Sequence, residues 1–118
     1  MTMTPVTILL TAAVALGCYL GWQYLKGQVR KPALTATHLL LGAGGLEQLA
    51  VGTQGFQADA SGSSGATAAV LIGLAMLTGF LTPLFGRESR RRANTLLITH
   101  VSVAAAGFLL FLGWVSNR

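Results

Sequence analysis

The sequence contains two histidines, His38 and His100, and each directly follows a threonine. Imidazole is the side chain that most often binds metals or moves protons near neutral pH. Other chemistry-bearing groups are scarce, with three acidic residues and one cysteine in the chain. The sequence shows no nucleophile triad, phosphate-binding loop or paired carboxylates, so catalysis by side chains alone has no support. The histidines are therefore the first candidates for a functional site, and a bound cofactor would supply its chemistry.

Four apolar stretches must position these histidines. Hydrophobic residues make up 53% of the 118-residue chain and charged residues only 9%, whereas soluble domains carry about 25% charge. A helix that crosses a bilayer needs roughly 20 mainly apolar residues. We therefore predict a single all-α domain over residues 1–118, an integral membrane four-helix bundle. Its helices are expected at residues 5–25, 33–52, 66–85 and 94–115.

Seven of the eight basic residues fall in two of the three expected loops. The loop between residues 53 and 65 has one charged residue, Asp59. The positive-inside rule places the basic loops in the cytoplasm and both termini on the opposite side, in a bacterial inner membrane or a thylakoid-type membrane. Topology explains the net charge of +5, so we expect no nucleic-acid partner. The basic loop residues are Lys26, Arg30 and Lys31 in the first loop and Arg87, Arg90, Arg91 and Arg92 in the third.

An internal repeat relates the two halves of the chain. At an offset of 62 residues without gaps, Thr37-His38 falls on Thr99-His100 and Gly17 falls on Gly79. Both hairpins start on the non-cytoplasmic side, so the repeat is parallel and its pseudo-two-fold axis lies along the membrane normal. The pattern predicts two related helical hairpins, and chance similarity between apolar stretches is the alternative.

The two histidines are expected at one depth in the membrane. Each is the sixth or seventh residue of its expected helix, which places both imidazoles about 9–10 Å from the cytoplasmic ends of those helices. Small residues follow one and two turns along each histidine's helical face. They are Gly42 and Gly45 after His38, and Ala104 and Gly107 after His100.

Two facing imidazoles and nearby small residues suit a flat cofactor. A pair of histidines can ligate haem iron from both sides, and helix bundles build cofactor sites between facing helices. The anionic propionates would point to the nearer surface, toward Arg30, Arg90, Arg91 and Arg92. A chlorophyll-type pigment bound by one or both histidines is an alternative, as is a structural hydrogen bond between helices. A two-ligand ion site is disfavoured because zinc usually takes three or four protein ligands.

The chain resembles the small four-helix b-type cytochromes of membranes. The resemblance rests on Thr37-His38, Thr99-His100, the glycines and the basic loops. The resemblance implies electron transfer through one bis-histidine haem b, in a small, non-catalytic subunit of a larger redox complex. The other hypothesis is a haem-free structural or assembly subunit of a respiratory or photosynthetic membrane complex, where the chain could contact pigment. Expected partners are the lipid bilayer and other membrane subunits. Glu47, with Gln48 and Gln54, would face water, a partner subunit or a quinone.

Overall fold

Four α-helices form the described part of the chain, and it contains no strand. The computed structural model describes residues 4–29, 31–52, 64–85 and 87–116. Arg30 and residues 53–63 of the expected loop at 53–65, which include Gln54 and Asp59, lie outside them. The helices are α1 (Thr4–Leu25), α2 (Pro32–Gly52), α3 (Ser64–Phe85) and α4 (Arg90–Ser116). The all-helical class and the four helices predicted from apolar runs are confirmed.

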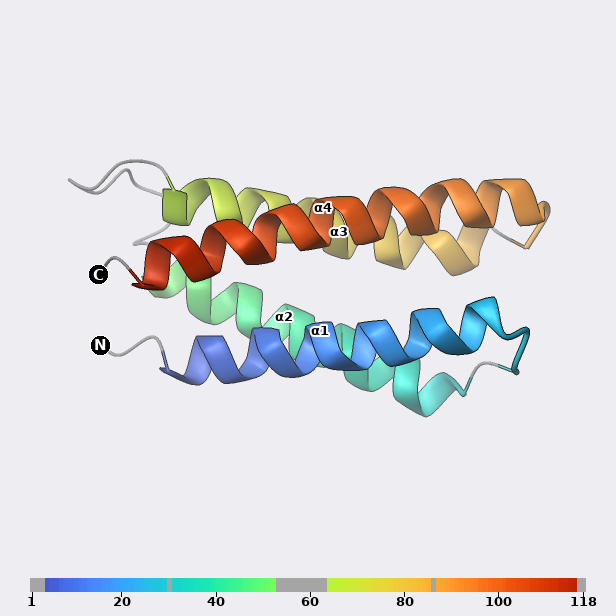
Figure 1. Cartoon of the computed structure of the whole chain (residues 1–118), viewed down its shortest axis with the longest axis horizontal. Coiled ribbons are helices and arrows are strands. Elements are labelled where there is room, and N and C mark those ends of the chain that lie inside the picture. Colours follow the sequence, from blue (N-terminus) through green and yellow to red (C-terminus); the bar gives the residue numbers. More distant parts are fainter. Residues whose placement is uncertain (1–3, 30, 53–63, 86, 117–118) are drawn as a thin grey trace.

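The helices form two hairpins that run in the same direction. In Figure 1, α1 and α3 run away from the end that holds both termini, and α2 and α4 return to it. The closely packed pairs are α1 with α2, α3 with α4, and α2 with α3. The histidine-bearing helices α2 and α4 therefore lie diagonally across the bundle. The remaining side, between α1 and α4, faces the viewer in Figure 1.

Three of these helices are long and apolar enough to cross a membrane, namely α1, α4 and the part of α3 from Thr67 to Phe85. Helix α2 has 21 residues but is less apolar, because it carries Glu47, Gln48 and His38. Many large apolar side chains point away from the bundle, among them Leu40, Ile98 and Leu109. Apolar outer surfaces of this kind are compatible with contact to lipid.

The packed core lies in the half of the bundle that holds the termini. Its buried cluster consists of Val6, Leu10, Leu49, Ala68, Ala69, Ile72, Phe111 and Trp114. Several of these residues are related by the 62-residue offset: Val6 and Ala68, Leu10 and Ile72, and Leu49 and Phe111. Burial therefore repeats along the chain as the aligned sequence does. The two hairpins contribute equivalent faces to one core.

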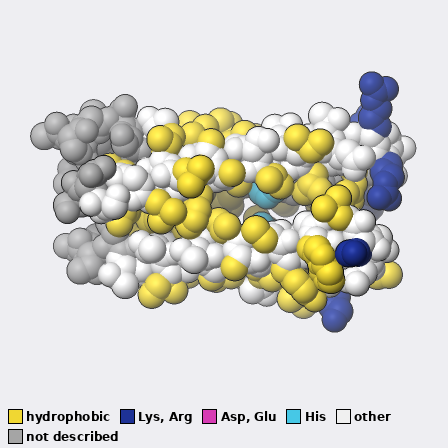
Figure 2. Space-filling view, in the orientation of Figure 1, with side chains coloured by type: hydrophobic (Ala, Val, Ile, Leu, Met, Phe, Trp, Pro, Cys, Tyr) yellow, Lys and Arg dark blue, Asp and Glu magenta, His cyan; other side chains and the backbone are white. Residues whose placement is uncertain are grey.

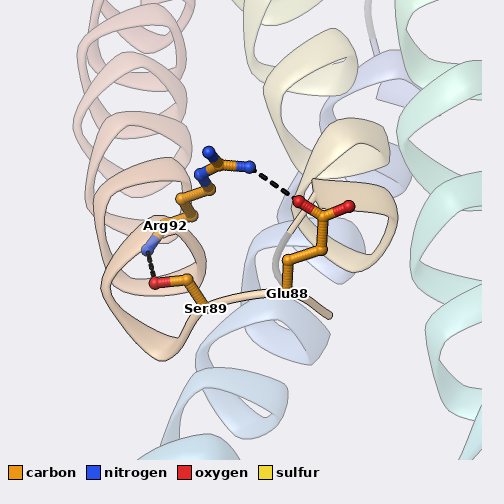
Figure 3. Close-up of polar contacts among 3 residues, drawn as sticks. All are labelled: Glu88, Ser89 and Arg92. Atoms are coloured by element: carbon orange, nitrogen blue, oxygen red, sulfur yellow. Dashed lines mark hydrogen bonds and ion pairs between the residues drawn. The ribbon is translucent and has the colours of Figure 1, made fainter.

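Helix α4 begins four residues earlier than expected, at Arg90 rather than Asn94. Ser89 explains this start, because its Oγ accepts a hydrogen bond of 3.4 Å from the Arg92 backbone N–H, as an N-cap residue does. Arg92 also forms a 2.8 Å ion pair with Glu88, one turn earlier (Figure 3). The expectation that Arg90, Arg91 and Arg92 lie in a loop is therefore wrong. They form the first turn of α4, which extends beyond its apolar segment.

Candidate functional site

His38 and His100 meet across the diagonal of the bundle. Their ring centroids are 6.1 Å apart, and the ring planes are nearly perpendicular, at 89°. The two residues lie on α2 and α4, which run in the same direction, so the repeat brings equivalent positions to one level. Both side chains are half-buried. The predicted pairing of the histidines is thus present in the structure.

Each imidazole is seated on a glycine of the other helix in its own hairpin. A Cβ added to Gly17 on α1 would lie 2.8 Å from Cε1 of His38, and a Cβ on Gly79 of α3 would lie 2.8 Å from Cε1 of His100. Real Cβ atoms do not approach ring atoms this closely, so any larger residue would displace the ring. Gly17 and Gly79 therefore set the positions of the two imidazoles.

Backbone carbonyls orient the rings in the same repeated manner. Nδ1 of His100 lies 2.6 Å from the carbonyl oxygen of Ala75. In the neutral ring this contact requires Nδ1 to carry the proton, which leaves the Nε2 lone pair available to a metal. Ala13, the repeat equivalent of Ala75, is the backbone group that interacts with the His38 ring. Nδ1 of His38 is buried and makes no hydrogen bond among the described residues, so this contact is looser than that of His100.

The histidines line a hollow on the side of the bundle between α1 and α4. Figure 2 shows histidine side chains at the bottom of this hollow, with hydrophobic side chains around it. The half of the bundle between the histidines and the basic end is also sparsely packed. Among the described residues in that half, only Gln23 is buried. The structure therefore combines a tight core near the termini with a loosely packed region beside the two imidazoles.

The four small residues predicted to flank the cofactor divide into two groups. Gly42 and Ala104 are half-buried, and a Cβ on Gly42 would meet no atom within 4 Å. By contrast, a Cβ on Gly45 would lie 2.5 Å from Leu10, and one on Gly107 would lie 3.1 Å from Ile72. Gly45 and Gly107 are thus close-packing positions within the two hairpins. Gly42 therefore has open space beside it, one turn past His38 on the side of the termini.

The predicted arginines also differ in their surroundings. Arg90 lies over the ring of Tyr24, with its guanidinium 5.5 Å from the centroid, at the basic end of the α1–α4 side. Arg92 is paired with Glu88, and Arg91 is exposed. Among the predicted site arginines that the structure describes, which are Arg90, Arg91 and Arg92, Arg90 is the one that contacts α1. Tyr24 also donates a hydrogen bond to Oδ1 of Asn94, so α1 and α4 are joined at this point.

The distance between the two ring centroids is compatible with one metal ligated by both imidazoles. Imidazole nitrogens bind first-row metals at about 2 Å, so two rings on opposite sides of one metal have centroids roughly 6 Å apart. The histidine pair has this spacing. Among the described residues, no three metal-binding side chains gather at one place. A donor set of two imidazoles suits a haem iron, whose remaining four ligands belong to the porphyrin.

Comparison with protein-family models, with curated proteins and with solved structures found no match to the chain. The assignment of this site therefore depends on its own geometry. The glycines seating the rings were the part that our sequence interpretation missed. The signal was present, because Gly17 and Gly79 align at the same 62-residue offset as the histidines.

Proposed function

We propose that the chain is an integral membrane electron-transfer protein that binds one b-type haem between His38 and His100. The observation that carries this proposal is the diagonal histidine pair, with centroids 6.1 Å apart beside a sparsely packed half of the bundle. When bound, haem iron cycles between two oxidation states and so carries one electron. In this proposal the chain is a small subunit of a larger redox complex.

In this proposal all four helices cross the membrane. Helix α2, with 21 residues, is about 30 Å long, enough to span the hydrocarbon core of a bilayer. Its imidazole turns into the bundle, as polar groups in membrane helices usually do. The exposed lysines and arginines that the structure describes gather at one end of the molecule (Figure 2). The positive-inside rule would put that end in the cytoplasm and both termini on the other side.

The protein's own residues prepare the site before any cofactor arrives. The carbonyl oxygen of Ala75 accepts a hydrogen bond from Nδ1–H of His100, which favours the tautomer that has a lone pair at Nε2. Gly17 and Gly79 hold the rings against α1 and α3. Apolar side chains surround the hollow beside the two rings. The Ala75 contact thereby sets the tautomer of His100, and the two glycines set the positions of both rings.

The direct test is a reduced-minus-oxidised absorption spectrum of the protein purified in detergent. We expect a sharp α band after dithionite, and we expect His38→Ala and His100→Ala each to remove it. Thr37→Ala and Thr99→Ala are matched controls. Their hydroxyls bond to carbonyls of their own helices, at 2.8 Å to Ala33 and 2.9 Å to Thr95. The controls should keep the band, and a protein that stays colourless with haem supplied would refute the proposal.

A second candidate function, a haem-free structural subunit, is favoured by the His100 contact alone. A histidine that bonds to a backbone carbonyl across a helix pair can serve packing without any cofactor. In that case His100→Ala would lower the stability of a colourless protein, and His38→Ala would have a smaller effect. A chlorophyll-type pigment would instead give its own long-wavelength absorption, lost with one or both histidines.

A further inference from the structure

The basic end of the α1–α4 side carries a cluster that the histidine site does not use. Tyr24 of α1 contacts two residues of α4: its hydroxyl donates a hydrogen bond to Oδ1 of Asn94, and its ring lies under the Arg90 guanidinium. These contacts join α1 to α4, two helices that are not closely packed elsewhere. Arg90 and the amide group of Asn94 supply donors in the same cluster. A guanidinium and an amide N–H held together in this way form a receptor for a carboxylate.

The distance between this cluster and the histidine site suits a haem side chain. Tyr24 lies seven residues beyond Gly17, which seats His38, and Asn94 lies six residues before His100. Both distances correspond to about 9–10 Å along the helix axes toward the basic end. This is comparable to the distance between a haem iron and the carboxylates of its propionate side chains. The loosely packed half of the bundle lies between the two levels.

We infer that Arg90 and Asn94, positioned by Tyr24, bind a propionate carboxylate of the tetrapyrrole. The inference rests on the proposed haem function. It selects Arg90, among the arginines at the basic end, as the residue that binds the anionic end of the ligand. Arg92 is disfavoured because Glu88 already pairs with it at 2.8 Å (Figure 3). Tyr24 acts through Asn94 and Arg90 as a positioning residue, since its hydroxyl is directed to the Asn94 carbonyl oxygen.

The test compares two ligands that differ only at the carboxylates. The full-length chain, prepared without haem in detergent, is titrated with haem b and with its dimethyl ester. We expect wild-type protein to prefer the free acid by about tenfold or more, the range of a charge-assisted hydrogen bond. Arg90→Gln combined with Asn94→Leu should abolish this preference. Both ligands should still give the bis-histidine spectrum.

Two variants make the assignment specific. Arg91→Gln removes an equal charge from the same helical turn and should keep the preference within about twofold. Tyr24→Phe keeps the ring under Arg90 but loses the hydroxyl, so it should reduce the preference by about threefold. Equal binding of the two ligands by wild-type protein, or an equal loss in Arg90→Gln and Arg91→Gln, would overturn the inference and leave the haem proposal standing. A wild-type chain that binds neither ligand would instead refute the haem proposal.

Discussion

Gly17 and Gly79 occupy equivalent positions in the two hairpins, and each contacts the edge of one imidazole. Side chains on a helix lean toward its N-terminus. His38 and His100 therefore lean toward the basic end, and the residues that accommodate them lie on the neighbouring helices. Our sequence interpretation looked for room along the histidines' own helices, at Gly45 and Gly107, where Leu10 and Ile72 pack. The packing of one helix against another decides where the imidazoles fit, and residue spacing within one helix does not reveal it.

Substitution of either seating glycine should disturb the site in the same way. We expect Gly17→Ala and Gly79→Ala each to shift an imidazole and to lower haem occupancy, because the new Cβ would lie 2.8 Å from a ring carbon. Overpacking of this kind costs about 1–3 kcal/mol. The measurement is the amplitude of the reduced α band together with the unfolding midpoint in detergent. Gly113→Ala is the control, because a Cβ at Gly113 would meet no atom within 4 Å.

An unchanged spectrum and midpoint in both seating-glycine variants would contradict this role. A large effect in only one of the two would show that the hairpins are not functionally equivalent. Because the His38 ring is held less tightly by Ala13, it can shift more easily in Gly17→Ala than the His100 ring can in Gly79→Ala.

At the level of the elements, the start of α4 was the main departure from expectation. The hydrophobic run begins near Leu96, and the sequence pattern therefore suggested a helix from Asn94. Ser89 extends the helix because its side chain satisfies a backbone N–H of the first turn. Hydrophobicity predicts where a helix is buried, but capping groups decide where it begins. The other three helices start within two residues of the expected positions.

Loss of this cap should destabilise α4. We expect Ser89→Ala to lower the free energy of unfolding by about 1 kcal/mol, as N-cap removal does. Thermal unfolding in detergent, followed by circular dichroism, measures the change. Ser116→Ala serves as a control at the other end of α4, where the hydroxyl bonds only to the carbonyl of Gly113, at 3.1 Å. Equal midpoints for Ser89→Ala and the wild type would show that α4 does not depend on this cap.

For the whole molecule, the repeat predicted from the sequence accounts for much of the arrangement. Buried positions, the seated imidazoles and the ring-facing backbone groups at Ala13 and Ala75 all recur at the 62-residue offset. The diagonal placement of α2 and α4 was not predictable, because hydrophobic periodicity does not specify which helices become neighbours. The departures from symmetry are local, such as the Tyr24 cluster at the basic end.

Orientation in the membrane can be tested with single cysteines. Cys18 is exposed, so it is first replaced by serine. Arg91→Cys then marks the basic end, and Ser116→Cys marks the end that holds the termini; both positions are exposed. In right-side-out bacterial membranes, an impermeant maleimide should label the Ser116→Cys variant and leave the Arg91→Cys variant unlabelled until the membrane is opened. The reverse labelling pattern would contradict the proposed topology.

If the histidines bind one cofactor as proposed, their division between two hairpins links the stability of the protein to the supply of that cofactor. Each hairpin brings one imidazole, and the packed core joins the hairpins only in the half that holds the termini. A ligand that bridges both imidazoles would bind the assembled chain and not the separated hairpins, so it would stabilise the assembly in proportion to the logarithm of its concentration. Newly made chains without cofactor would be joined at the basic end by the contacts of Tyr24 and not by a packed core, so they would open more easily there and be exposed to proteolysis. The abundance of the protein in a cell should therefore follow the supply of its cofactor.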